Sequence, residues 1–278
     1  MDELTILLLT ILILIGAAIA PMVGLGGGVV FVPTLMYIGG VAATDATRYS
    51  QLGILGVSII STINHYRAKK CEIKLALLLE PITILGALIG AEINLDIDNV
   101  LLKSLFGLML FIVGIRMYMK IRSSGIKTNH NTEDLMNNFS LGNYTYKQIV
   151  IGMVFSFFAG MMAALLGLGG GVLKVPILIF FFNLPASKAA GTSSTMIILT
   201  SSTAIVRYTL AGAYNKLGVV VAFLLILCGL TGSYIGTRYS TTKLKSKEIQ
   251  ALFAILIIFI GCFTVLDTIL LRDLLVSD

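Results

Sequence analysis

The chain has 278 residues, of which 57% are apolar or aromatic and only 12% are charged, with a formal net charge of +6. A soluble domain carries roughly twice that charge density, and a mean hydropathy of +0.96 is too high for a globule in water. The composition therefore places the chain in a bilayer and excludes a soluble enzyme, a nucleic-acid-binding protein and a disulfide scaffold.

Ten apolar stretches bounded by charge predict an all-α polytopic membrane protein. The first follows Met1, Asp2 and Glu3 without the basic start of a secretory signal, so we expect it to be retained in the membrane. The predicted segments are residues 4–22, 29–40, 46–64, 75–91, 100–118, 149–166, 172–183, 190–210, 217–237 and 250–271.

The two sets of five segments repeat each other. The sequence GLGGGVVFVP of residues 24–33 returns as GLGGGVLKVP at residues 167–176, and GALIG of 86–90 matches GSYIG of 232–236. A polar stretch rich in Asn, Thr and Ser separates the two sets. We therefore predict a first transmembrane repeat (1–120), a cytoplasmic linker loop (121–147) and a second transmembrane repeat (148–278).

Because five is odd, consecutive halves enter the membrane from opposite sides, which predicts two inverted repeats. Thirteen of the 20 basic residues lie in three alternate loops, 67–74, 116–147 and 238–248, whereas Glu92, Asp96 and Asp98 share a loop without a basic residue. The positive-inside rule then puts both termini outside the inner (plasma) membrane. An interpretation with eight spans, in which the first two segments of each half form one re-entrant hairpin, gives the same sidedness for the other loops.

Each GLGGG motif leads into a segment of about twelve residues, which as a helix reaches only about 18 Å and cannot cross a bilayer. Glycines at such a break expose backbone N–H groups at the positive end of the next helix, which favours an anion. The predicted binding glycines are Gly26, Gly27, Gly28, Gly169, Gly170 and Gly171. The alternative is close helix packing through small residues. A nucleotide-binding fingerprint is excluded, because valine stands where its last glycine is needed.

The third and eighth segments are the most polar of the ten, and they follow the two short segments. Ser50 and Gln51 occupy positions equivalent to Ser193 and Ser194, and Thr192 precedes that pair. We expect these groups to line a substrate pathway. The alternative is that the hydroxyls bond back to their own helices.

Five ionisable residues lie inside the predicted segments: Arg48, Glu80, Arg116, Lys174 and Arg207. Lys174 follows the second glycine tip, so its ammonium is the best candidate for contact with an anion. Arg48 and Arg207 are candidates for gating, with snorkelling as the alternative, and Arg116 belongs to the cytoplasmic interface. Glu80 could carry a coupling proton, the alternative being a plain interfacial carboxylate.

No metal site or cofactor is expected. Cys71, Cys228 and Cys262 are scattered without CxxC spacing, and His65 and His130 stand far apart without an accompanying carboxylate pattern.

The doubled GxGGGxxxVP motif, the Ser/Thr-rich segment after each copy and the polar loop between two apolar halves resemble the sulfite exporter TauE/SafE family of membrane permeases. The resemblance covers essentially the whole chain. It implies a bacterial or archaeal inner-membrane protein that moves sulfite, organosulfur compounds or small carboxylate anions. The matching motif positions are residues 24–28 with Pro33 and residues 167–171 with Pro176. Lys174 stands where the first copy has Phe31, so the half-sites are not equal.

We therefore hypothesise a secondary transporter, not an enzyme, that binds a small anion between the two glycine tips and works by alternating access. Its expected partners are the anion, the lipid bilayer, a coupling proton and a second copy in a homodimer, with no nucleic acid. The alternatives are an anion channel, which needs a continuous polar lining, and an intramembrane enzyme, which needs a base and nucleophile paired at membrane depth.

Overall fold

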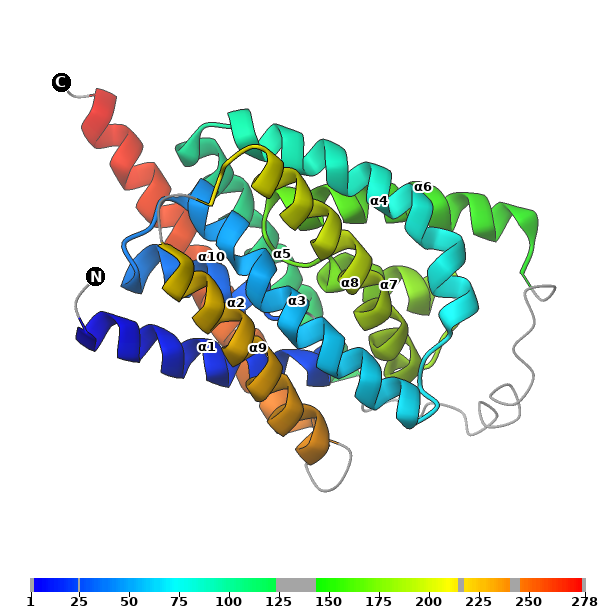
Figure 1. The fold of residues 1–278 in the computed structure, drawn as a ribbon. Coiled ribbons are helices and arrows are strands. Elements are labelled where there is room, and N and C mark those ends of the chain that lie inside the picture. Colours follow the sequence, from blue (N-terminus) through cyan, green and yellow to red (C-terminus); the bar gives the residue numbers. More distant parts are fainter. Residues whose placement is uncertain (1–2, 25, 124–143, 215–217, 241–245, 277–278) are drawn as a thin grey trace.

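The computed structural model describes residues 3–24, 26–123, 144–214, 218–240 and 246–276, and these are helical without any strand. The linker predicted at 121–147 lies mostly outside the described residues, and His130 lies outside them too. The elements (Figure 1) are α1 (Glu3–Val23), α2 (Gly28–Pro33), the π-helical turn η1 (Thr34–Ile38), α3 (Ala43–Arg67), α4 (Ile73–Asp96), α5 (Asn99–Ser123), α6 (Tyr146–Leu165), α7 (Gly171–Phe180), α8 (Ala186–Leu210), α9 (Gly218–Ser240) and α10 (Ser246–Val276).

The helices coincide with the predicted segments, so the all-helical polytopic membrane fold is confirmed. Within the described residues, six helices are long and apolar enough to cross a membrane: Glu3–Pro21, Ile73–Asp96, Asn99–Met119, Tyr146–Leu165, Ala186–Leu210 and Gly218–Arg238. Their outer faces carry large apolar side chains such as Leu85, Phe158 and Phe223, each more than half exposed. Such a surface requires lipid around it.

The two short helices start from left-handed glycines. Gly27 precedes α2 with φ 92°, and Gly170 precedes α7 with φ 76°, a backbone conformation that residues with a Cβ rarely adopt. After Pro33, which has no N–H to donate, the helix widens into the π-turn η1, where Gly39 N donates to Thr34 O at 3.1 Å.

Both short helices turn back toward the end of the bundle from which the preceding helix came. Leu35 of η1 shares a small apolar pocket with the first turns of α1. Past α7, Phe182 lies edge-on to Tyr144, which directly precedes α6, with ring centroids 5.2 Å apart. Each glycine-tipped segment therefore forms a hairpin with the helix before it, and the choice between the two predicted topologies stays a prediction.

Paired glycines bring long helices into backbone contact. A Cβ on Gly86 or Gly90 of α4 would overlap carbonyl oxygens of α6, and a Cβ on Gly232 or Gly236 of α9 would approach or overlap those of α1. Backbones this close leave no room for a larger side chain. The repeated Gly-x-x-x-Gly motif thus makes the same kind of helix contact in each half.

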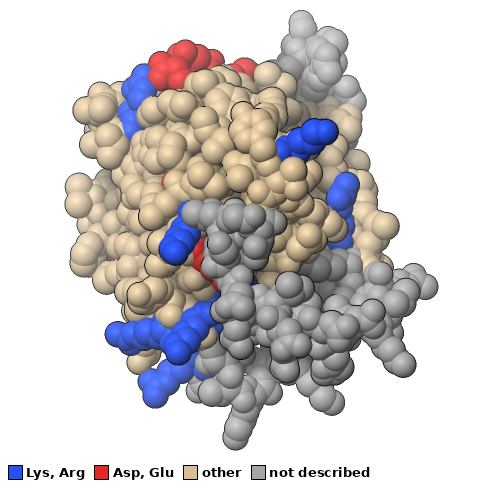
Figure 2. Space-filling model, turned by 90° about the vertical axis from the view of Figure 1, so that its right-hand side faces the viewer, with Lys and Arg blue, Asp and Glu red and all other residues tan. Residues whose placement is uncertain are grey.

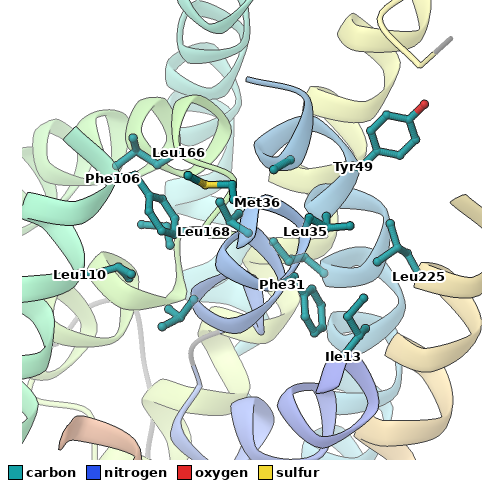
Figure 3. Packing of buried hydrophobic residues seen from close by; sticks show 14 of the residues in the cluster. Ile13, Phe31, Leu35, Met36, Tyr49, Phe106, Leu110, Leu166, Leu168 and Leu225 are labelled. Carbon is teal, nitrogen blue, oxygen red and sulfur yellow. The ribbon is translucent and has the colours of Figure 1, made fainter. Parts of the chain in front are cut away.

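The hairpins pack around a central pair, α3 and α8, and α5 packs against α10 on the outside. The largest buried apolar cluster joins α1, α2, η1 and α3 to α5, to α9 and to the second tip (Figure 3). It includes Phe31, Leu35, Phe106, Leu168 and Leu225, all of which are buried. This packing holds the first hairpin against elements of both halves.

Charged side chains gather at the two ends of the bundle. Figure 2 shows Asp and Glu along the upper edge of one face and Lys and Arg on its lower part, with further Lys and Arg on the upper part of the same face. We call the end with exposed Arg67, Lys69 and Lys74, at the α3–α4 junction, the basic end. The other end, with exposed Glu92 and Asp96 where α4 runs into α5, is the acidic end.

Candidate functional site

The two glycine tips cross in the middle of the bundle, where each touches the backbone of the other. A Cβ on Gly28 would overlap the carbonyl oxygen of Gly167, and a Cβ on Gly171 would overlap that of Gly24. These two contacts are equivalent under exchange of the halves. The predicted glycines Gly26 to Gly28 and Gly169 to Gly171 therefore come together, which confirms close packing at the tips, while the binding of an anion by their backbone N–H groups stays a prediction.

Two isoleucines close the crossing. A Cβ built on Gly26 would lie 3.4 Å from Ile197 Cδ1 and 3.6 Å from Ile54 Cγ2, and one on Gly169 would lie 2.7 Å from Ile54 Cγ2. Ile54 and Ile197 stand halfway along α3 and α8 at equivalent positions and are buried. The tips thus meet in a tightly packed, apolar collar.

The predicted polar groups beside the tips bind tip carbonyls. Ser50 Oγ donates to Gly167 O at 2.9 Å, Gln51 Nε2 donates to Ala163 O at 2.7 Å, and Ser193 Oγ approaches Gly24 O at 3.4 Å. Ser50 and Ser193 also bond back within their own helices, to carbonyls three residues earlier, as the alternative interpretation held. They fix the crossing from opposite sides.

A buried ion pair lies one helical turn from the second tip. Lys174 N donates to Gly170 O at 2.8 Å, and Lys174 Nζ stands 3.7 Å from Glu80 Oε1 of α4. Thr200 of α8 bridges them, because its hydroxyl accepts from Lys174 Nζ and donates to Glu80 Oε1 at 2.7 Å. Lys174 and Glu80 are each 1% exposed.

This burial corrects the interfacial interpretation of Glu80, whose carboxylate lies inside the protein because three helices converge on it. Its second oxygen, Oε2, has no hydrogen-bond partner among the described residues. At the positions of the first half equivalent to Lys174 and Thr200, the chain has the buried apolar residues Phe31 and Val57. The ionic cluster thus joins Glu80 of the first half to Lys174 and Thr200 of the second, and apolar residues replace its second-half members at the equivalent positions.

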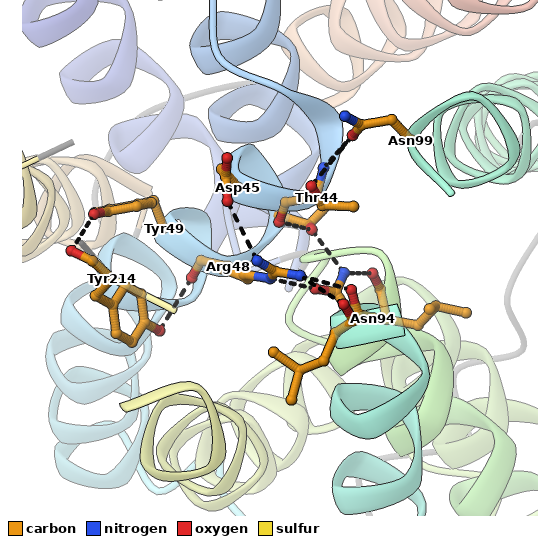
Figure 4. Close-up of polar contacts among 10 residues, drawn as sticks. Thr44, Asp45, Arg48, Tyr49, Asn94, Asn99 and Tyr214 are labelled. Atoms are coloured by element: carbon orange, nitrogen blue, oxygen red, sulfur yellow. Dashed lines mark hydrogen bonds and ion pairs between the residues drawn. The ribbon is translucent and has the colours of Figure 1, made fainter. Parts of the chain in front are cut away.

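At the acidic end, Arg48 holds three elements together (Figure 4). Its Nε donates to Asn94 Oδ1 at 2.8 Å, and its Nη1 pairs with Asp45 at 3.3 Å. Beside it, Tyr49 OH donates to Tyr214 O at 2.5 Å, and Tyr214 OH donates to Arg48 O at 3.3 Å. Burial raises the pKa of the Tyr214 phenol, which keeps it a donor. Snorkelling does not describe Arg48, whose side chain is only 11% exposed.

At the basic end, the start of α8 is tied to the residues that precede α4. Lys188 Nζ pairs with Glu72 Oε1 at 2.5 Å, and Glu72 N donates to Thr192 Oγ1 at 3.0 Å. Cys71 Sγ lies 2.9 Å from Thr195 Oγ1, and burial raises the pKa of this thiol. Thr192 therefore takes part in a cluster at the basic end.

Two other predicted residues lie apart from the tips. Ser194 shares a hydrogen bond with Ser61 of α3, at 2.9 Å. Arg207 pairs with Glu92 of α4 at 2.6 Å, with side chains 29% and 55% exposed, so this is a surface contact at the acidic end.

Sequence reasoning missed Glu72, Lys188, Asn94 and Tyr214. The internal repeat carried a signal for one of them, because Lys188 occupies the position equivalent to Asp45. Asp45 forms an ion pair at the acidic end of the bundle, and Lys188 forms one at the basic end. The others lie in a loop or at the end of a helix.

Comparison with known proteins adds a second line of evidence. The family model described as Sulfite exporter TauE/SafE matches residues 8–264. The "Probable membrane transporter protein YunE" of Bacillus subtilis (strain 168) is 27% identical over 273 residues, which cover 93% of this chain and 97% of the relative.

More distant organisms have relatives too. A "Probable membrane transporter protein" of Methanocaldococcus jannaschii is 25% identical over 276 residues, with 94% and 97% coverage. The "Sulfite exporter TauE/SafE family protein 5" of Arabidopsis thaliana is 33% identical over 107 residues, 38% of this chain and 24% of the relative. No solved structure matches.

Proposed function

Because the chain belongs to the sulfite exporter TauE/SafE family of membrane transporters, we propose that it is a secondary transporter of a small anion, with sulfite or an organosulfonate as the favoured substrate. The observation that carries the proposal is the crossing of two glycine tips beside the buried Lys174. We place the protein in the inner (plasma) membrane with both termini outside, from the charge of its loops.

The anion preference follows from the groups around the tips. The first N–H groups of α7 have no carbonyl partner within the helix and carry its positive partial charge. Lys174 adds an ammonium one turn further along. Ser50 and Ser193 place hydroxyls beside the tips, and their protons, which main-chain carbonyls accept in this structure, would have to turn toward the anion to bind it. This set suits a compact oxyanion such as sulfite or the headgroup of a sulfonate.

Alternating access is the mechanism that the packing favours. α4 packs on α6 as α9 packs on α1, and α3 packs on α9 as α8 packs on α4. These pairs interchange when the halves are exchanged, which supports two inverted repeats and two states of similar energy. The clusters around Arg48 and Lys188 close the acidic and basic ends, so we interpret them as the two gates of an occluded state. The arrangement is compatible with a homodimer.

A channel or an intramembrane enzyme would be a different class of protein. The collar of Ile54 and Ile197 interrupts any continuous polar path through the tips, which favours a carrier. The names of the relatives are those of transporters rather than enzymes.

The decisive experiment is a flux screen of the purified protein in liposomes, with sulfite, sulfate, thiosulfate, methanesulfonate and short carboxylates. We expect saturable flux of one class, lost in Lys174→Ala and retained in Arg116→Ala, which removes an exposed cation from α5. Absence of flux for every anion would refute the proposal. Single-channel conductance far above carrier turnover would establish a channel, and chemical change of a lipid or peptide would establish an enzyme.

A further inference from the structure

The Glu80–Lys174 pair has a geometry that packing alone does not require. Replacing a buried ion pair by apolar side chains is often neutral or stabilising, so stability is a weak reason to keep one. The fold itself supplies the comparison, since the first half has the buried apolar residues Phe31 and Val57 at the positions equivalent to Lys174 and Thr200. The pair, which joins Glu80 of the first half to Lys174 of the second, therefore points to a function rather than to stability.

One oxygen of the Glu80 carboxylate also lacks a hydrogen-bond partner among the described residues. Glu80 Oε1 accepts the Thr200 hydroxyl at 2.7 Å, whereas Oε2 is buried without a hydrogen-bond partner in the described part of the chain. A separation of 3.7 Å between Lys174 Nζ and Oε1 is longer than a charge-assisted hydrogen bond. A carboxylate with one free buried oxygen can take up a proton there without breaking the contact to Thr200.

Among the residues that the structure describes, the carboxylate of Glu80 faces a single opposite charge, that of Lys174. α7 contains no other ionisable residue. On the neighbouring helices the remaining ionisable residues lie toward the ends: Lys74, Glu92 and Asp96 on α4, Tyr146 and Lys147 on α6, and Lys188, Arg207 and Tyr208 on α8. The state of Glu80 thus decides whether the ammonium of Lys174 is neutralised.

We propose that Glu80 is a proton-binding site that couples proton movement to anion movement through Lys174. With Glu80 ionised, the carboxylate holds the ammonium of Lys174. When a proton binds to Oε2, the carboxyl becomes neutral and the ammonium is free to meet an anion at the Gly170 tip. The distance is short, because a Cβ on Gly170 would lie 3.3 Å from Lys174 Cε. One proton and one singly charged anion then enter together, so the buried charge is unchanged.

This inference rests on the proposed anion transport and gives it a driving ion. The direction of the pH effect is fixed. A lower pH on the side from which the anion binds should strengthen anion binding, since protonation neutralises the Glu80 carboxylate that competes with the anion for Lys174. Methanesulfonate is a suitable probe, because a sulfonate keeps its charge over the pH range in which sulfite itself takes up a proton.

The test uses the full-length protein in liposomes and measures two activities. The first is accumulation of labelled methanesulfonate driven by a pH gradient, and the second is exchange of labelled for unlabelled methanesulfonate without a gradient. For one proton per anion, a gradient of one pH unit supports about tenfold accumulation in the wild type. Glu80→Gln should keep exchange, lose the accumulation and become insensitive to pH. Asp96→Asn, which removes an exposed carboxylate from the same helix, should behave as the wild type.

Gradient-driven accumulation in Glu80→Gln would overturn the coupling role while leaving anion transport intact. Loss of exchange in folded Glu80→Gln would overturn it too, since the ionised carboxylate would then be needed for binding itself. If Glu80→Gln does not fold, a pH-sensitive dye inside wild-type vesicles counts the protons that enter with each anion, and a count of zero would refute the proposal. If the wild type moves neither methanesulfonate nor sulfite, the proposed function fails instead.

Discussion

Removing the cation of the buried pair should destabilise the protein far more than removing both charges. In Lys174→Met the carboxylate of Glu80, 1% exposed, loses its counter-charge. Breaking one side of a buried ion pair costs about 3–5 kcal/mol, whereas replacing both partners by apolar groups is often close to neutral. In Lys174→Met/Glu80→Leu the Thr200 hydroxyl still has the carbonyl of Met196 at 2.8 Å. We therefore expect the double variant to regain most of the lost stability and to remain inactive in anion flux.

The free energy of unfolding is measured by denaturant titration in detergent micelles, with Arg116→Met as the matched control. Because Arg116 is exposed, that control should stay within about 0.5 kcal/mol of the wild type. The loss in Lys174→Met should shrink in acid, where a proton can neutralise the lone carboxylate. A Lys174→Met variant as stable as the wild type, or a double variant as weak as the single one, would refute the claim that these two charges compensate each other.

Three further predictions concern the tips and the gates. Gly170→Leu should abolish anion flux without preventing membrane insertion, because Gly170 has φ 76° and a Cβ there would meet Ala163 Cβ at 2.9 Å. The control Gly40→Asn, at a position where a Cβ meets open space, should keep its flux. Normal flux in Gly170→Leu would show that the tip only packs. With the other two cysteines replaced, Lys188→Met should speed maleimide labelling of Cys71, since it removes the ion pair to Glu72 at the basic end; an unchanged rate would remove this pair from the gate. Tyr49→Phe should slow the same labelling up to about tenfold by favouring opening of the acidic end, because it removes one buried hydrogen bond worth about 0.5–1.5 kcal/mol, and faster labelling would contradict the gating scheme.

The helices and the glycine tips could be predicted from the sequence because their signals are local. Apolar stretches long enough to span and a glycine cluster that breaks them are visible without knowledge of neighbours, and the internal repeat identified which positions correspond. Length also showed that the short helices cannot cross a bilayer on their own, but it left open whether they are re-entrant. Helix ends were less visible, and α4, for example, continues to Asp96 beyond the predicted end at 91, because a helix does not stop where lipid-facing side chains give way to charge.

The pairing of Lys174 with Glu80 could not be predicted, because it depends on the register of α4 against α7 and α8. That register is set by glycine contacts such as that of Gly86 with the α6 backbone, which fix how far one helix slides past another. The sequence contained both residues and even suggested separate roles for them. It could not reveal that burial and one bridging threonine make them a single unit.

The internal repeat explains how one scaffold can hold an asymmetric site. Ser50 and Ser193 hold the crossed tips in equivalent ways, and the glycine contacts are equivalent too, so the packing itself favours neither half. The buried charge distinguishes the two halves, since Lys174 of the second half occupies the position equivalent to Phe31 of the first. Two inverted states of such a scaffold would have equal energy if the halves were identical. An ionisable pair between Glu80 of the first half and Lys174 of the second, with the apolar Phe31 at the position equivalent to Lys174, makes the balance between the states depend on protonation.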